Sequence, residues 1–232
     1  GGNSGSDRLA DMAMPRDRAT IEYYFSFLSL WSDIGSATFQ AIVSKHGAGV
    51  VFKPVDLLAV FAAGGGKPVR ERALPRQAYR LVEMQRWRTI RGVPLVTWPK
   101  YYPADPSLGH RMLLAAIDDG GDVHPFVHAC LKGVWADELD IADAATLVRL
   151  ADASGLDGRR LLDRRDDPVL IDRERQLTQE AIGRQIFGAP FYVFRGEPFW
   201  GQDRLELLDG VIGSDRPPLA WPDLMHDPAA SG

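Results

Sequence analysis

The chain has 232 residues, 45% of them hydrophobic, and a formal net charge of −4. That length and composition allow one large domain with a real core, and the charge balance argues against a nucleic-acid-binding surface, which would need a clustered excess of lysine and arginine. No apolar stretch approaches the ~20 residues that a membrane-spanning helix needs, so no membrane association is expected. The one cysteine, Cys130, cannot form an internal disulfide and fits a reducing compartment, and a cytoplasmic location is expected.

The first predicted elements form a β-α-β unit. Residues 21–27 are rich in aromatic and β-branched side chains and predict a strand. Ser29 precedes a segment whose apolar residues fall at helical spacing as far as Gly47, and a second strand is expected at residues 50–55. A crossover of this length joins parallel strands.

The middle of the chain is predicted to be helical and the end is predicted to be a hairpin. Glycine and proline break residues 62–75 into a loop, and residues 93–109 form a long proline-punctuated connection. Helices are expected at 75–90, 108–117, 125–135, 142–153, 158–162 and 167–187. The stretches "APFYVF" and "EPFW" then predict two strands around a tight turn, and "QDRLELLDGVIG" predicts a closing helix.

This order of elements predicts an α/β fold with a large all-helical insertion. We expect a flexible leader over residues 1–18, a discontinuous α/β domain over residues 19–66 and 186–216, the insertion over residues 67–185, and a C-terminal tail over residues 217–232. We find no internal repeat and no low-complexity segment.

Two other motifs carry little chemistry. In "HPFVHAC", His124 and His128 are spaced i,i+4, which can bind a metal, and Cys130 lies close by. No third and fourth ligand is evident for this histidine pair, so no metal site is expected. "GGGKP" lacks the spacing and the Ser/Thr of a phosphate-binding loop.

Ser29 lies at the junction of the first strand and helix, where two interpretations are open. A serine in this position is a good helix N-cap, worth ~1 kcal/mol. The same position also places a hydroxyl beside the unpaired N–H groups and the positive dipole end of the helix, where a catalytic group is often found.

Three stretches resemble a known family. The order of elements resembles the thioredoxin fold, and "FSFLSLWSDIG" resembles the active-site turn of 2-hydroxychromene-2-carboxylate isomerases, which belong with the kappa-class glutathione transferases and are relatives of the DsbA proteins. "GAPFYVFRGEPFWGQDRLELL" is similar to their C-terminal stretch, and "LPRQAYRLVEMQRWRTIRGVPL" to a middle motif. The resemblance covers residues 21–213.

The resemblance implies a glutathione cofactor and a site. Ser29 would face the thiol of bound glutathione as the catalytic residue. The residues implied in glutathione binding are Arg76, Ala189, Pro190 in the cis form, Trp200, Gln202 and Asp203. A small aromatic substrate from aromatic-compound degradation would contact Trp31, Tyr102 and Arg111. Family members are commonly homodimers, and the same is expected here.

The turn has no Cys-x-x-Cys, because Ser29 and Ser32 occupy the two corresponding places. A thioredoxin-fold oxidoreductase needs a low-pKa cysteine there, so the thiol must be borrowed. A helix dipole contributes ~1–2 kcal/mol and a hydrogen bond to a charged group ~1.5–3 kcal/mol. At ~1.36 kcal/mol for each pKa unit, their upper sum lowers a thiol pKa by more than about three units, enough to ionise it substantially at neutral pH.

Several positions depart from the family pattern. Leu30 replaces a proline, Ser26 an aspartate, Phe191 a threonine and Glu83 an aspartate. Three functions are therefore weighed: a glutathione-dependent isomerase, a kappa-like transferase that keeps the conjugate, and a non-enzymatic protein that binds a thiol or peptide.

Overall fold

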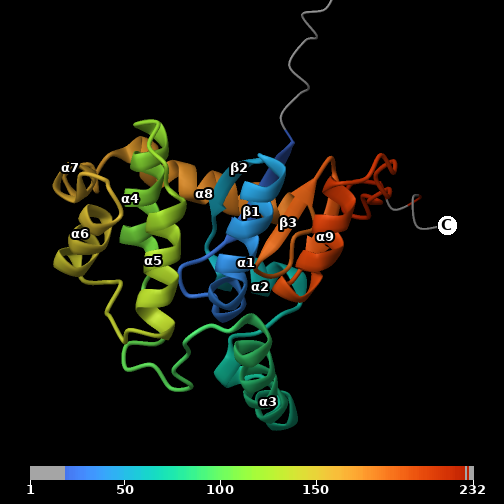
Figure 1. Ribbon diagram of the computed structural model, residues 1–232, viewed down its shortest axis with the longest axis horizontal. Coiled ribbons are helices and arrows are strands. Elements are labelled where there is room, and N and C mark those ends of the chain that lie inside the picture. Colours follow the sequence, from blue (N-terminus) through green and yellow to red (C-terminus); the bar gives the residue numbers. More distant parts are fainter. Residues whose placement is uncertain (1–18, 228, 230–232) are drawn as a thin grey trace, which may run out of the picture.

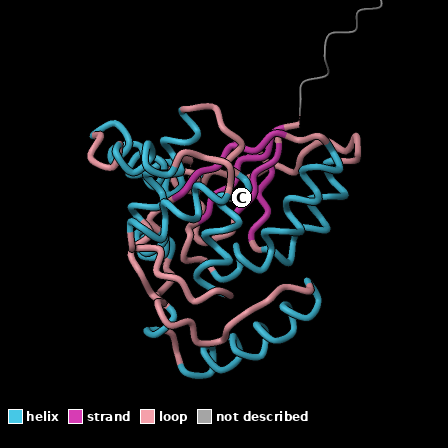
Figure 2. The backbone as a smooth tube through the Cα atoms, turned by 60° about the vertical axis from the view of Figure 1, so that its left-hand side comes forward, coloured by secondary structure: helices cyan, strands magenta, loops and turns pink. Residues whose placement is uncertain are grey.

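The computed structural model describes residues 19–227 and 229, with a four-stranded sheet between helices (Figures 1 and 2). The sheet has the order β2-β1-β3-β4. β2 runs parallel to β1, whereas β3 pairs antiparallel with both β1 and β4. The strands are β1 (Thr20–Phe25), β2 (Gly49–Pro54), β3 (Phe191–Phe194) and β4 (Glu197–Trp200). The predicted leader, residues 1–18, lies outside the described residues.

Alternate strand residues face opposite sides of the sheet, and both sides are covered. On one side, Tyr23 stacks on Tyr192 at 5.4 Å between ring centroids and packs against Phe39 of α1 (Leu30–His46). α9 (Leu205–Ile212) packs beside α1. On the other side, Tyr24 and Phe191 belong to a second cluster under α2 (Leu57–Gly64) and α8 (Pro168–Gly183).

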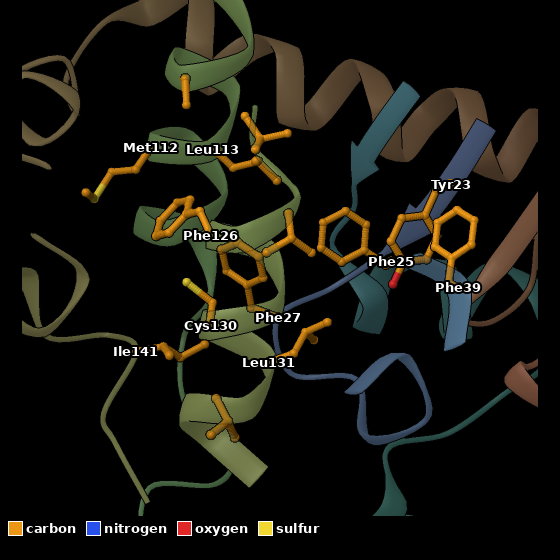
Figure 3. Packing of buried hydrophobic residues seen from close by; sticks show 14 of the residues in the cluster. Tyr23, Phe25, Phe27, Phe39, Met112, Leu113, Phe126, Cys130, Leu131 and Ile141 are labelled. Carbon is orange, nitrogen blue, oxygen red and sulfur yellow. The ribbon is translucent and has the colours of Figure 1, made fainter. Parts of the chain in front are cut away.

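The remaining helices form the predicted insertion. α4, α5, α6 and α7 stand together beside the sheet, and α3 stands apart from them (Figure 1). Rings of Phe25 and Phe27 continue the sheet core into Phe126 and Leu131 of the insertion (Figure 3). These helices are α3 (Leu74–Arg91), α4 (Ser107–Asp118), α5 (His124–Trp135), α6 (Ala144–Ala153) and α7 (Gly158–Asp163); η1 (Val69–Glu71) and η2 (Gln202–Arg204) are 3-10 turns.

The observed fold confirms the predicted α/β architecture with a helical insertion. No helix among residues 19–227 and 229 combines the length and apolar character needed to cross a bilayer. The limits proposed for the separate domains stay a prediction, although the sheet and the insertion share one continuous core.

One helix was not predicted, and two predicted boundaries are wrong. α2 was missed because "LLAVFAAG" is apolar on all sides and shows no helical period; its capping residue, Asp56, accepts from the Ala59 N–H. β1 ends at Phe25 rather than at residue 27, because the chain turns at Ser26. α8 ends at Gly183 rather than at residue 187, and Gln185 just beyond it is left-handed, with φ 67°.

Candidate active site

The turn between β1 and α1 presents Ser29 at the start of α1. The Ser29 N–H donates to the Ser26 carbonyl at 3.0 Å, and the Ser26 hydroxyl accepts from the Leu28 N–H at 3.2 Å. The Ser29 backbone is extended, and its Oγ accepts from the Ser32 N–H at 3.2 Å, so Ser29 is the N-cap of α1. The side chain is 5% exposed. The capping interpretation is therefore confirmed, and the catalytic role stays a prediction.

The peptide bond between Ala189 and Pro190 is cis, as the resemblance implied, and it lies opposite Ser29. The Ser29 hydroxyl donates to the Ala189 carbonyl at 3.4 Å, which is long for an O–H···O bond. The Gly201 N–H donates to the Pro190 carbonyl at 2.9 Å and ties this loop to the end of β4. Together these contacts bring three segments that are far apart in the chain to the start of α1.

Trp200 at the end of β4 borders the same loop. Its ring is half exposed and packs against Phe187 at 4.8 Å between centroids. A Cβ added to Gly188 would lie 2.7 Å from the Trp200 indole nitrogen, so only glycine permits this close approach. Trp200 is thus positioned next to the cis-proline loop, and its predicted contact with glutathione remains a prediction.

Gln202 and Asp203 begin the final helical segment but have different surroundings. Gln202 is buried, and both its side-chain and backbone oxygens accept from Arg91, at 2.8 and 2.7 Å. Arg91 also pairs with Glu206. The Gln202 carboxamide oxygen therefore fixes η2 to the end of α3. Asp203 keeps its carboxylate half exposed and available to a ligand, with Arg204 at 3.5 Å as a loose partner.

An aromatic wall stands beside the turn. The Trp135 indole N–H donates to the Leu28 carbonyl at 3.2 Å, directly before Ser29. Tyr102 packs on Trp135 with ring centroids 4.6 Å apart. Trp31, in the first turn of α1, is partly exposed. The structure thus joins Tyr102 to the turn at Ser29 through Trp135, a buried residue that the sequence analysis did not place in the candidate site.

Two arginines near this wall lack acidic partners among the described residues. The Arg80 guanidinium lies 5.8 Å above the Trp135 ring, and it donates to the Met84 sulfur at 3.6 Å. The Arg72 Nε donates to the Lys67 carbonyl at 2.9 Å. Burial lowers the pKa of both arginines, and the Tyr102 phenol opposes that effect at both. Because arginine keeps its charge at physiological pH, the two side chains leave positive charge uncompensated beside Tyr102.

The two basic residues that the sequence analysis placed in the site, Arg76 and Arg111, have different surroundings from Arg72 and Arg80. Arg76, one turn before Arg80 on α3, is exposed and makes no ion pair with any described residue. Arg111 lies on α4, and its Nε is buried without a hydrogen-bond partner in the described part of the chain. Neither side chain has a recorded contact with the turn at Ser29, and both proposed roles stay predictions.

His110 holds the turn from the side of α4, and the sequence analysis missed it. It is fully buried; its Nε2 accepts from the Phe27 N–H at 3.1 Å and its Nδ1 lies 3.1 Å from a Glu174 carboxylate oxygen. Because Nε2 must accept, the ring is neutral with its proton on Nδ1, which donates to Glu174. Gly109 lets α4 come close, since a Cβ there would meet the Phe27 ring at 2.9 Å.

The three residues considered for a metal have other surroundings. The His128 Nδ1 lies 2.9 Å from the Ser36 hydroxyl, and His124 packs between the rings of Phe39 and Phe52. Cys130 is fully buried, and burial raises the pKa of its thiol well above the usual value. Within residues 19–227 and 229, no three His, Cys, Asp or Glu side chains gather as a metal site would require.

Asp33, in the first turn of α1, is a second feature that the sequence did not reveal. The residue is 5% exposed. Burial raises its pKa to about 7; nearby Asp137 adds to the rise and Lys132 opposes it. The folded protein therefore keeps the Asp33 proton up to about pH 7, whereas the unfolded chain releases it near 3.8.

This difference makes stability fall as the pH rises. The folded state binds one more proton than the unfolded state between pH 3.8 and 7, so the free energy of unfolding drops across that window and stays low above it. Asp33→Asn removes the ionisation, and we expect it to raise the free energy of unfolding at pH 8 by about 2 kcal/mol. Urea unfolding at pH 5 and pH 8 checks this; equal pH slopes for variant and wild type would contradict it.

The β-α-β and β-β-α units around one mixed sheet, with a cis proline opposite the first helix, are the arrangement of a thioredoxin-like protein. In this chain the turn before α1 carries Ser29 and Ser32 instead of the usual cysteine pair. Residues 20–213 match the DSBA-like thioredoxin domain, and the chain belongs to that family.

Within this family, the chain is similar to 2-hydroxychromene-2-carboxylate isomerases. A 2-hydroxychromene-2-carboxylate isomerase of Sphingobium xenophagum is 27% identical over 195 residues, covering 83% of this chain and 97% of that protein. The enzyme of that name from Pseudomonas putida is 26% identical over 198 residues, covering 83% and 94%. A solved structure of a 2-hydroxychromene-2-carboxylate isomerase has a TM-score of 0.70 at 24% identity, covering 84% of this chain and 94% of that one. The resemblance predicted from the three motifs is confirmed.

Proposed function

We propose that this protein is a glutathione-dependent isomerase of the 2-hydroxychromene-2-carboxylate isomerase type, acting on a small aromatic 2-oxo acid. The observation that carries the proposal is the position of Ser29, whose hydroxyl caps α1 and faces the cis-proline loop. A thioredoxin-like oxidoreductase needs a cysteine at this position. The chain's own thiol, Cys130, is buried among the helices of the insertion. The names of the curated relatives support the reaction type.

The chemistry of the site fits glutathione, which carries a thiol, an ammonium group and two carboxylates. Ser29 offers a hydroxyl, and the first turn of α1 offers backbone N–H groups at the positive end of the helix dipole. Arg72 and Arg80 offer positive charge, and Asp203 offers a half-exposed carboxylate. When bound, glutathione would supply the thiolate that adds reversibly to the conjugated double bond of the substrate, which allows the bond to rotate.

The chain's own residues would then have separable tasks. The Ser29 hydroxyl would turn from the long bond to Ala189 and donate to the anion, since hydrogen bonds to charged acceptors are the stronger ones. The Tyr102 ring, which the buried Trp135 ring supports from behind, would pack on the aromatic substrate. The Arg80 guanidinium would pair with a carboxylate of a ligand seated on that wall.

Product analysis tests this function against its two alternatives. Wild-type protein incubated with glutathione and a cis-trans pair of aromatic 2-oxo-alkenoates should yield the other isomer with no net loss of glutathione. A stable glutathione conjugate would instead show a kappa-like transferase. Neither product, together with thermal stabilisation by glutathione, would show a thiol- or peptide-binding protein that is not an enzyme.

Substitution of Arg80 separates the two candidate carboxylate-binding residues on α3. Arg80→Met keeps the length of the side chain and removes an unpaired charge from the Trp135 ring, so we expect the KM of the aromatic acid to rise ~10-fold. Arg76→Met is the matched control, because Arg76 lies one turn away and is exposed; its KM should stay within ~2-fold of wild type. The reverse ranking in steady-state kinetics would assign the role to Arg76.

Two further expectations accompany the proposal. The protein would work as a homodimer, as the family resemblance implied, and in the cytoplasm, as its single cysteine indicated. Sedimentation equilibrium of the purified chain measures the oligomeric state, and a monomer at micromolar concentration would contradict the first of these.

A further inference from the structure

The chain continues beyond the part that matches its family, and that continuation is held against the sheet. The family match ends at residue 213, whereas the structure describes the chain without a break to residue 227. Within this C-terminal segment, residues 214–227, Arg216 pairs with Glu197 of β4 at 2.9 Å, and the Leu219 N–H donates to the same carboxylate at 2.8 Å. Glu197 is 4% exposed, so these contacts satisfy a buried charge.

A second attachment lies at Gln185, just after α8. Its side-chain amide donates to the Pro222 carbonyl at 2.7 Å, and its side-chain oxygen accepts from the Leu224 N–H at 2.7 Å. Both bonds attach the chain just after Trp221. They hold residues 222–224 in a defined register and replace backbone partners that a free tail would find only in water.

Between the two attachments, Trp221 stacks on Phe191. The rings are 5.8 Å apart at 15° between planes. Phe191 directly follows the cis Pro190, and its ring also meets Phe187 edge-on at 5.4 Å. Phe187 in turn packs on Trp200. Trp221 is therefore the last in a series of four contacting rings. Two of the other three, Phe187 and Phe191, lie at the two ends of the cis-proline loop.

We infer that the C-terminal segment is a clamp that positions the cis-proline loop, with Trp221 as its positioning residue acting through Phe191. The loop it holds supplies the Ala189 carbonyl opposite Ser29 and the Pro190 carbonyl bonded to Gly201. The clamp lies on the side of the sheet covered by α2 and α8, since Trp221 packs against the cluster that contains Phe191, Tyr24 and Val60. The clamp thus contacts the loop from the side of the sheet opposite α1.

The identity of residue 191 fits this contact. Residue 191 is phenylalanine, and the segment that covers it lies past residue 213, where the family match ends. A threonine at position 191 would give Trp221 no ring to stack on, and without the segment the Phe191 ring would lose its cover. An aromatic stacked pair favours one orientation of both partners, which a small polar side chain would not impose.

Hydrogen exchange on the full chain tests the clamp without any ligand. In Trp221→Ala, the amides of residues 187–189, Phe191 and Gly201 should exchange ~10-fold faster than in wild type, while α4 and α5 keep their protection. Trp221→Phe restores a ring and should lie within ~3-fold of wild type. The matched control is Leu224→Ala, since the Leu224 side chain is half exposed and its N–H bond to Gln185 is kept.

Gln185→Ala provides a milder variant, because it removes two hydrogen bonds to the segment and deletes no aromatic ring. We expect the same amides to exchange ~3-fold faster in this variant than in wild type. Unchanged exchange at residues 187–191 in Trp221→Ala would overturn the clamp. So would an equal acceleration in α4 and α5, because that would be global destabilisation.

A kinetic measurement rests in addition on the proposed function. Trp221→Ala should raise the KM of glutathione ~5-fold with little change in kcat, since a loosened loop weakens binding before it alters the hydroxyl of Ser29. Wild-type protein that bound no glutathione would refute the proposed function and leave the exchange result standing. A normal exchange pattern in Trp221→Ala would refute the clamp and leave the proposed function standing.

Discussion

Replacing Ser29 with alanine is expected to lower the rate of glutathione-dependent isomerisation about 100-fold or more, the cost of removing one donor from a site that stabilises an anion. The hydroxyl is the side-chain donor placed at the α1 terminus, and its bond to the Ala189 carbonyl at 3.4 Å is weak enough to be exchanged for a charged acceptor. Steady-state kinetics with saturating glutathione measures the effect on kcat.

A control must separate this effect from the loss of the cap. Ser29→Ala also removes the acceptor for the Ser32 N–H, worth ~1 kcal/mol of stability. Asp143→Ala removes the matching cap of α6, where Asp143 accepts from the Thr146 N–H far from the turn, and it should leave kcat unchanged. Turnover in Ser29→Ala within a few-fold of wild type would reduce Ser29 to a helix cap.

Replacing His110 with leucine is expected to lower the free energy of unfolding by about 3 kcal/mol, although the volumes are similar. The substitution leaves the Phe27 N–H without its acceptor in a fully buried place and removes the proton that the ring donates to Glu174. Each group left unpaired costs ~1–3 kcal/mol. Urea unfolding followed by circular dichroism measures the change.

His226→Leu is the comparison for this measurement, since His226 is exposed and its side chain pairs, among residues 19–227 and 229, with Asp223 on its own segment. It should change stability by less than ~0.5 kcal/mol. A His110→Leu protein as stable as wild type would show that α4 does not hold the turn through this histidine.

The parts of the site that sequence predicted are those written in short motifs. Ser29 at the strand-helix junction and Pro190 before a strand are local patterns, and the structure places both as expected, with the proline cis. The β-α-β order likewise follows from local periodicity and from the length that a parallel pair requires. These features need no knowledge of distant residues.

The parts that sequence missed depend on contacts across the chain. The Trp135 bond to Leu28 joins residues 107 apart, and the His110 bond to Phe27 joins residues 83 apart. On α3, Arg76 and Arg80 are one turn apart and chemically the same, yet only Arg80 reaches the Trp135 ring. Packing of the insertion on the sheet decides which of them faces the site, and no local pattern records that packing.

The buried carboxyl of Asp33 illustrates the same limit. In the sequence it is an acidic residue in the first turn of a helix, which ordinarily predicts a solvated charge that favours the dipole. The approach of α5 buries it beside Lys132 and Asp137 and reverses its effect on stability. Its role could not be predicted before the neighbours of α1 were known.

The most direct test of the account is an ultraviolet difference titration of glutathione bound to the wild-type protein. The account predicts that thiolate absorbance appears with a midpoint near pH 7 or below, about two units or more under that of free glutathione, because the α1 terminus and the Ser29 hydroxyl both favour the anion. A bound thiol that ionises at the same pH as free glutathione, or no saturable binding at all, would contradict it.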